Sequence, residues 1–234
     1  MLATHRIFRE ATLGFISHTA ASVDEMLKAA TDTSKCLKAS PFESDSSHSP
    51  FNTRHGVPMF TYYAQNPRFA ARFAKAMAGA AKVDRQISEL RDCFPWDTLK
   101  GTVVDVGGGS GHISLALAKP QREAAAFFIR QCTHNWCDRD VITIFKSFVP
   151  GLEGSKKGTP LLINETVMPE PGLRPAREER ALGQLGVLVL VGLGAKQRTK
   201  AEFEALLKDA DPRYEIASVH ADGPMGLLEV HLKH

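Results

Sequence analysis

Three polar residues in the second half of this chain lie where one ligand could bind, and two of them, a histidine and a glutamate, could perform acid–base chemistry on it. His134 and Glu165 each follow an apolar run, and Gln197 follows a glycine turn at residues 192–194. Imidazole exchanges protons near neutral pH, so a histidine is suited to deprotonating a hydroxyl group. A carboxylate beside it would orient the ring and stabilise its charged form. The pattern indicates a general base with an orienting partner, although a histidine at a helix start that bonds only to backbone is the alternative.

A glycine-rich turn is the second candidate for ligand binding. Asp105 precedes Gly107, Gly109 and Gly111 in the pattern D-x-G-x-G-x-G. The dinucleotide fingerprint needs G-x-G-x-x-G, and a phosphate-binding P-loop needs Gly-Lys-Ser/Thr, so neither motif fits. The pattern favours a loop that brings the backbone close to a cofactor, as in folds that bind S-adenosylmethionine (SAM). A glycine turn without a ligand is the alternative interpretation.

Alternating strands and helices are predicted from residue 101 onward, and they would position these residues. The predicted strands are residues 103–106, 125–130 and 160–164, and the predicted helices are residues 113–118, 138–148, 177–191 and 200–209. Thr199 and Glu202 form a capping box at the start of the last helix. Residues 214–221 and 227–232 then read as an antiparallel hairpin. This alternation predicts an α/β fold with a mostly parallel sheet and a ligand at the carboxyl ends of its strands.

The first hundred residues have a different pattern. Arg6–Arg9 and Phe15–His18 suggest a β-ribbon, and residues 39–50 have the composition of a loop. Asn66 and Pro67 are a typical helix start. Phe69, Phe73 and Met77 follow at a spacing of four, which predicts an apolar stripe in a core or in a pocket wall. A further helix is expected at about residues 82–93.

Composition and charge exclude several classes of protein. Hydrophobic residues make up 43% of the chain and charged residues 24%, which is ordinary for a globular protein. The net charge of +3 comes from interleaved acids and bases, so we expect no nucleic-acid partner. We find no leader and no apolar run long enough to span a membrane, which predicts a cytoplasmic protein. The cysteines fit no C-x-x-C pattern and predict reduced thiols without a metal site; they are Cys36, Cys93, Cys132 and Cys137.

Several segments share their residue pattern with one known family. They are His5–Glu10 with His18–Ser22, Gly56–Met59, the glycine loop, Phe128–Trp136, Leu161–Pro169, Ala195–Thr199 and the closing hairpin. Over nearly its whole length the chain resembles a fungal member of the plant-type small-molecule SAM-dependent O-methyltransferases. The His-Asn-Trp segment together with the glycine loop is the most specific part of this resemblance.

The resemblance implies roles for the acid–base residues. His134 would be the general base that removes the proton of a phenolic or enolic hydroxyl in a secondary-metabolite pathway. The resulting oxygen nucleophile would attack the sulfonium methyl of SAM in line. Glu165 matches one of two acids that flank this histidine in the family. Gln197 stands where the family has the second acid, and it could bond the imidazole without supplying a full charge.

The resemblance also implies which residues bind the two ligands. The loop from Asp105 to Gly111 would pass beneath the methionine end of SAM, and Arg130 would help to hold that end. Phe73 and Met77 match the helix that lines the acceptor pocket, which implies an aromatic or polyketide-like small molecule as acceptor.

The chain departs from the family pattern after the glycine loop. Relatives place two strands and two helices between that loop's helix and the strand equivalent to residues 125–130. An acid in this segment binds the ribose, and a later loop frames the adenine. Here the strand follows Pro120 almost at once. The resemblance therefore predicts a SAM site whose adenosine-binding half is missing, and a strand at residues 103–106 that lies at a sheet edge and invites pairing.

These expectations define the domains and leave the function open. We predict a partial winged-helix and helical domain for dimerisation and acceptor binding at residues 1–99. A reduced Rossmann-like class I methyltransferase domain would occupy residues 100–234 and lack a central block after residue 120. The alternatives to O-methyl transfer are a cyclase or isomerase that reuses the pocket and His134, and a silent partner or regulatory subunit. We expect a homodimer or a heterodimer with a longer homologue.

Overall fold

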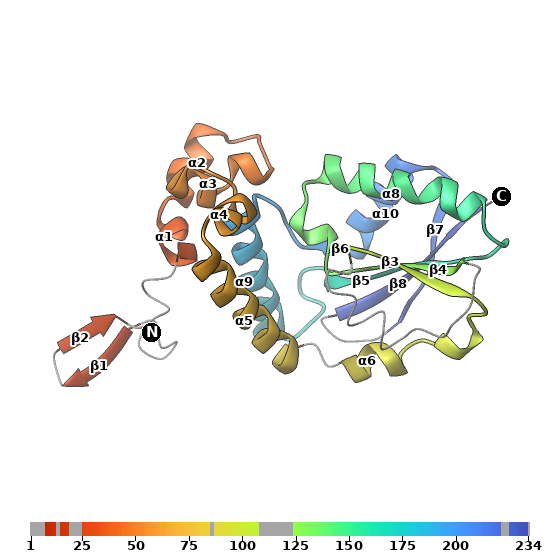
Figure 1. Cartoon of the computed structure of the whole chain (residues 1–234), viewed down its shortest axis with the longest axis horizontal. Helices are drawn as coiled ribbons and strands as arrows, with labels where there is room; N and C mark the ends of the chain where they lie inside the picture. The colour runs from red at the N-terminus through yellow and green to blue at the C-terminus, as the bar shows by residue number, and fades with distance from the viewer. Residues whose placement is uncertain are drawn as a thin grey trace.

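A sheet flanked by helices forms one half of the molecule, and a group of helices forms the other half (Figure 1). The structure is a computed structural model that describes residues 8–12, 15–18, 25–84, 87–107, 124–220 and 225–233. The mixed α/β architecture with a mainly helical first part is the one predicted from the sequence. No helix among the described residues is long and apolar enough to cross a membrane.

The main sheet has the strand order β3-β4-β5-β8-β7. Three parallel strands come first: β3 (Thr102–Val106), β4 (Ala124–Arg130) and β5 (Leu161–Met168). β8 (Met225–Leu232) pairs antiparallel with β5 and with β7 (Tyr214–His220), which confirms the closing hairpin. The short β6 (Arg198–Thr199) pairs with the end of β5. Among the described strands, β3 lies at one edge of the main sheet, as expected, and β7 lies at the other edge.

Alternate residues along the central strands point to opposite faces of the sheet and pack into two separate hydrophobic cores. On one face, Ile129 and Ile163 pack beneath α8 (Asp138–Glu153) and α10 (Lys200–Ala210). On the other face, Phe128 and Leu162 pack against residues around α6 (Ile87–Asp92) and η3 (Trp96–Thr98). Both faces are therefore covered, which explains why these strands read as continuous apolar runs rather than as alternating ones.

The helical half takes one helix from the second half of the chain. Its own helices are α1 (Glu25–Thr31), α2 (Thr33–Ala39), α3 (Pro50–His55), α4 (Met59–Gln65) and α5 (Pro67–Asp84). α9 (Ala176–Leu193) runs alongside them (Figure 1). Val189, Val191 and Leu193 of α9 are buried against Phe51 and Met59. The core of this half is thus built from residues far apart in the sequence.

Several element boundaries differ from the sequence prediction. The helix expected at residues 82–93 is instead the end of α5 followed by the separate, short α6. β5 was expected to end before Glu165 but extends to Met168, because β8 pairs with it as far as Thr166 and β6 pairs with its last two residues. The loop tract at residues 39–50 contains a short turn, η2 (Ser46–His48), and helices α1 to α4 were not predicted.

Two other predictions concern the ends and the glycine loop. β1 (Phe8–Thr12) and β2 (Phe15–His18) pair antiparallel, which confirms the N-terminal ribbon. The helix expected at residues 113–118 lies outside the described residues, and so do Gly109 and Gly111.

Candidate active site

The loop between β4 and α8 carries His134 across the end of β5. Gln131 leaves the strand with a φ of 48°, a left-handed conformation that is uncommon outside glycine. Its backbone N–H donates to the carbonyl oxygen of Asn164 at 3.0 Å, which ties the start of the loop to β5. The short turn η4 (Thr133–Asn135) follows and holds His134. We refer to residues 131–137 as the histidine loop.

Glu165 is the buried anchor of this loop. Its Oε1 accepts from the backbone N–H groups of Cys132 (2.7 Å) and Thr133 (2.8 Å) and from the Thr133 hydroxyl (3.0 Å). Its Oε2 lies 2.8 Å from Nδ1 of His134. Burial alone would raise the pKa of the Glu165 carboxyl, but the hydrogen bond and charge of His134 and the hydrogen bonds of Thr133 hold that pKa below its ordinary value. The acid therefore stays ionised beside the imidazole.

This pairing decides how His134 can act. An ionised carboxylate only accepts hydrogen bonds, so Nδ1 must carry the proton and the neutral ring keeps its lone pair on Nε2. The His134 side chain is 16% exposed, whereas the Glu165 side chain is 1% exposed. The ring can therefore meet a ligand with Nε2 while its partner stays sealed from water.

Arg198 holds the other side of the histidine loop. Its guanidinium donates to the carbonyl oxygens of Thr133 (3.0 Å) and Trp136 (2.9 Å). It also donates twice to Oδ1 of Asp138, at 2.9 and 2.7 Å. Burial would raise the pKa of Asp138, but Arg198 and then Lys196 lower it below its ordinary value. Sequence reasoning assigned no role to Arg198 or Asp138, because neither has a local motif.

Gln197 lies beside this cluster without bonding the histidine. Its side chain is buried, and it directly precedes Arg198. In the part of the chain that the structure describes, no hydrogen bond joins Gln197 to His134; the ring is bonded by Glu165. Lys196 instead forms ion pairs with Asp138 and Glu202.

Of the residues expected to bind a cofactor, the structure describes Asp105, Gly107 and Arg130, which lie on β3, directly after β3 and at the end of β4. Gly107 follows β3 with a φ of 78°, and a Cβ added there would lie 3.2 Å from Sγ of Cys132. Asp105 lies opposite Phe128 in the β3–β4 pairing. Arg130 ends β4 and donates to Oδ1 of Asn164 on β5. The carboxyl ends of β3, β4 and β5 thus bring Gly107, Arg130 and Glu165 to one edge.

The residues expected to line an acceptor pocket lie on α5. The ring of Phe73 stacks on Tyr63 with ring centres 4.8 Å apart and packs against the core of the helical half. The side chain of Met77 lies outside the described part of the structure. The role of both residues in a pocket remains a prediction.

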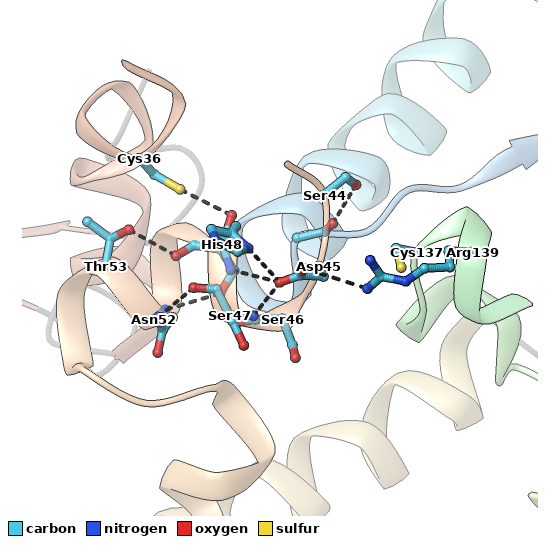
Figure 2. A network of polar contacts seen from close by, with 12 residues as sticks. Cys36, Ser44, Asp45, Ser46, Ser47, His48, Asn52, Thr53, Cys137 and Arg139 are labelled. Carbon is cyan, nitrogen blue, oxygen red and sulfur yellow. Dashed lines mark hydrogen bonds and ion pairs between the residues drawn. The ribbon is translucent and has the colours of Figure 1, made fainter. Parts of the chain in front are cut away.

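The tract before α3 connects the helical half to the site (Figure 2). The Ser44 hydroxyl donates to the carbonyl oxygen of Gly194 at 2.8 Å. The Asp45 carboxylate accepts from two backbone N–H groups and lies 2.9 Å from Nδ1 of His48. It also forms a 3.8 Å ion pair with Arg139 on α8. Ser44 therefore ties this tract to Gly194, three residues before Gln197, and Asp45 ties it to α8.

Gly194 fits this contact only because it is glycine. It caps α9 with a φ of 61°, and an added Cβ would fall on the carbonyl oxygen of Asp45, well inside contact distance. Glu43, Asp45 and His48 also bring ligand atoms within 4.8 Å of one another, but the Asp45 carboxylate is already bonded within the tract.

Comparison with known proteins places the chain among methyltransferases. No protein-family model matches it. O-methyltransferase sol2 of Alternaria solani is 58% identical, over 99% of this chain and 67% of that protein. That alignment extends over 291 positions, whereas this chain has 234 residues, so the relative carries residues within the aligned stretch that this chain lacks. O-methyltransferase pyvH of Aspergillus violaceofuscus is 24% identical, over 97% of this chain and 69% of that protein.

Solved structures share the fold at low sequence identity. The mitomycin 7-O-methyltransferase MmcR matches with a TM-score of 0.71 at 18% identity, over 99% of this chain and 81% of that one. LepI in complex with SAM matches with a TM-score of 0.70 at 16% identity, over 99% and 74%. A protein described as a pericyclic reaction enzyme matches equally well, with a TM-score of 0.70 at 15% identity and the same coverage.

Proposed function

Because the chain belongs to the fungal O-methyltransferases, we propose that it transfers a methyl group from SAM to a hydroxyl of a small secondary metabolite, with His134 as the general base. The acceptor is a phenolic or enolic hydroxyl on an aromatic or polyketide-like molecule. The observation that carries the proposal is the 2.8 Å contact between Nδ1 of His134 and the buried Glu165 carboxylate. This contact leaves Nε2 as the basic atom of the ring.

The proposed chemistry needs one proton transfer by this chain. Nε2 of His134 takes the proton of the acceptor hydroxyl, and the electron pair of the O–H bond stays on the acceptor oxygen. SAM supplies, when bound, a methyl group on a sulfonium sulfur that this oxygen can attack. The charge on the imidazolium is balanced by Glu165, whose lowered pKa keeps it ionised. Gln197 is proposed as a neutral neighbour of the ring, which leaves Glu165 to supply the balancing charge.

The residues at the sheet edge fit the methionine end of SAM. Gly107 has a positive φ, and a Cβ at this position would crowd the Cys132 side chain. Only glycine therefore fits the turn at which the ligand would bind. Arg130 at the end of β4 presents a cation at the same edge. We therefore propose Asp105, Gly107, Gly109, Gly111 and Arg130 as the SAM-binding residues.

The proposal includes weak binding of the adenosine half. We propose that the family's central block after residue 120 is missing, consistent with the 291-position alignment to a 234-residue chain. We also propose that residues 1–99 form the helical acceptor-binding part and that residues 100–234 form the catalytic part. α9 belongs to the second range but packs with the helices of the first. Partners would be a second copy or a longer homologue, in the cytoplasm and without nucleic acid.

A second function, as a cyclase or isomerase, uses the same pocket. The likeness to a pericyclic reaction enzyme supports only the fold of such an enzyme, because the identity is 15%. In that case His134 would act on an acceptor-like substrate without methyl transfer. A product with unchanged mass would identify this function.

Calorimetric titration with SAM and S-adenosylhomocysteine tests the first step of the proposal. Transfer of a radiolabelled methyl group from SAM to resorcinol and to a chlorophenol tests the second step. The variant His134→Ala should lose transfer but keep SAM binding, and His231→Ala is the matched control, because His231 lies at the end of β8 that is remote from Glu165. Absence of SAM binding at millimolar concentration contradicts methyl transfer. Full transfer by His134→Ala contradicts the role of the base.

A further inference from the structure

Arg198 is buried to an extent that is rare for an arginine. Its side chain is 1% exposed, on the two-residue strand β6 beside the end of β5. A buried guanidinium is costly unless its N–H groups are bonded and its charge is paired. Here Nε and Nη2 donate to Oδ1 of Asp138, and Nη1 and Nη2 donate to two carbonyl oxygens. The burial is therefore compensated by a specific set of partners.

Two of those partners flank His134 along the chain. The two carbonyl oxygens belong to Thr133 and Trp136, which lie on either side of His134 in the histidine loop. On the opposite side, Glu165 accepts from the N–H groups of the same loop at Cys132 and Thr133. The Arg198 guanidinium binds carbonyl oxygens of the loop, and the Glu165 carboxylate binds its backbone N–H groups. The loop is thus fixed from two sides by groups of opposite charge.

We propose that Arg198 is the positioning residue that keeps Nε2 of His134 in register with the acceptor hydroxyl; the kinetic part of this inference rests on the proposed function. Glu165 fixes the Nδ1 side of the ring but cannot by itself fix the loop downstream of His134. Arg198 supplies that constraint through Trp136 and through Asp138, the first residue of α8. A misplacement of about 1 Å at a reacting group can cost about 100-fold in rate.

The role requires the guanidinium fork and not only a positive charge. Four groups accept from this one side chain: the carbonyl oxygens of Thr133 and Trp136, the more distant carbonyl oxygen of Lys196 at 3.5 Å, and the Asp138 carboxylate. Arginine presents five N–H donors in a rigid plane, whereas lysine is a flexible point charge with three donors. Arg198→Lys should therefore keep the ion pair with Asp138 while releasing at least one carbonyl of the loop.

The test compares Arg198→Lys with Arg213→Lys. Arg213 also forms a two-point contact with an acid, Asp211, but it precedes β7 at the edge of the sheet opposite to the site. The two tryptophans of the chain are labelled with 5-fluorotryptophan and followed by fluorine NMR, with Trp136→Phe to assign the signals. Trp136 reports on the histidine loop, and Trp96, packed against Phe94 and Phe128, is the internal reference.

We expect Arg198→Lys to broaden or shift the Trp136 signal and to leave Trp96 unchanged. Its kcat should fall about 10- to 100-fold, with the KM for SAM and for resorcinol within about threefold of the parent. Arg213→Lys should change neither signal nor kcat. An unchanged Trp136 signal in folded Arg198→Lys overturns the proposal, and so does equal broadening of both signals, which would assign Arg198 a general structural role.

A second variant covers the case in which Arg198→Lys does not fold. Asp138 is half exposed, and Asp138→Asn keeps an acceptor while removing the charge that orients the guanidinium. Its Trp136 signal should shift while Trp96 stays unchanged, and an unaltered Trp136 signal overturns the proposal. If the parent chain transfers no methyl group, the proposed function fails, but the fluorine spectra still decide whether Arg198 holds the loop.

Discussion

Replacing Glu165 by glutamine is the most direct perturbation of the proposed base. The amide is nearly the same size as the carboxylate, and its oxygen can still accept from Cys132, Thr133 and the Thr133 hydroxyl. Its NH2 group must then face Nδ1 of His134 and donate to it. The ring must then carry its proton on Nε2, so this nitrogen has no lone pair to take the proton of the acceptor hydroxyl.

The expected effect on activity is much larger than the effect on folding. A histidine held in the wrong tautomer cannot take the hydroxyl proton, and the same kind of exchange in hydrolase triads costs about 10⁴-fold in kcat. We expect a loss of about 10³- to 10⁴-fold. Because the three contacts to Oε1 persist, the free energy of unfolding should fall by only about 1.5 to 3 kcal/mol, the value of a charge-assisted hydrogen bond.

Single-turnover transfer of a radiolabelled methyl group measures the chemical step directly, and urea unfolding at neutral pH measures the loss of stability. Glu215→Gln is the matched control, since Glu215 pairs with Lys233 on the outer hairpin. More than a tenth of the parent rate in Glu165→Gln, with the histidine loop intact, would refute the assignment of the tautomer and with it the role of His134.

Three further predictions concern stability. The pKa of Glu165 is lower in the folded chain than its ordinary 4.5. The stability that its ionised form contributes is therefore complete above pH 4.5 and is lost as the pH falls through the folded pKa. Below pH 4.5 the urea midpoint should decline more steeply for the parent than for Glu165→Gln. Thr199→Ala removes the hydroxyl that accepts from the backbone N–H of Glu202 (3.2 Å) and should cost about 1 kcal/mol, read as a lower Tm, whereas an unchanged Tm would exclude a stabilising cap. Gly194→Ala forces a Cβ onto the Asp45 carbonyl at a left-handed φ and should cost more than about 1 kcal/mol in urea unfolding, and a neutral result would mean that the tract before α3 can move away freely.

Local patterns predicted the carboxyl ends of the strands where the site lies, because each apolar run stops at polar residues. The apolar runs before His134 and Glu165 gave the two parallel strands, and parallel strands bring their carboxyl ends together. The capping box at Thr199 was equally visible, since both partners lie within one turn. The two parallel strands bring the residues that follow them together, and this accounts for the contact between His134 and Glu165.

The other half of the site depends on contacts between distant residues. Arg198 bonds to carbonyl oxygens more than 60 residues away, and a carbonyl oxygen has no sequence signature. Ser44 and Gly194 are separated by 150 residues, and the tract that contains Ser44 has only the composition of a loop. Helices α1 to α4 are short, so their apolar spacing was too brief to distinguish them from irregular chain.

The placement of α9 has a consequence for how such enzymes can exchange parts during evolution. Gly192 on α9 leaves room for the side chains of Met26 and Met59, whose nearest atoms would lie 3.0 and 3.1 Å from a Cβ at that position. A recombination that replaced residues 1–99 alone would separate Gly192 of α9 from the two methionines that it accommodates. The packing unit of the helical half is therefore discontinuous in sequence, and a chimera that carries α9 together with its own helices is expected to be more stable than one that exchanges residues 1–99 alone.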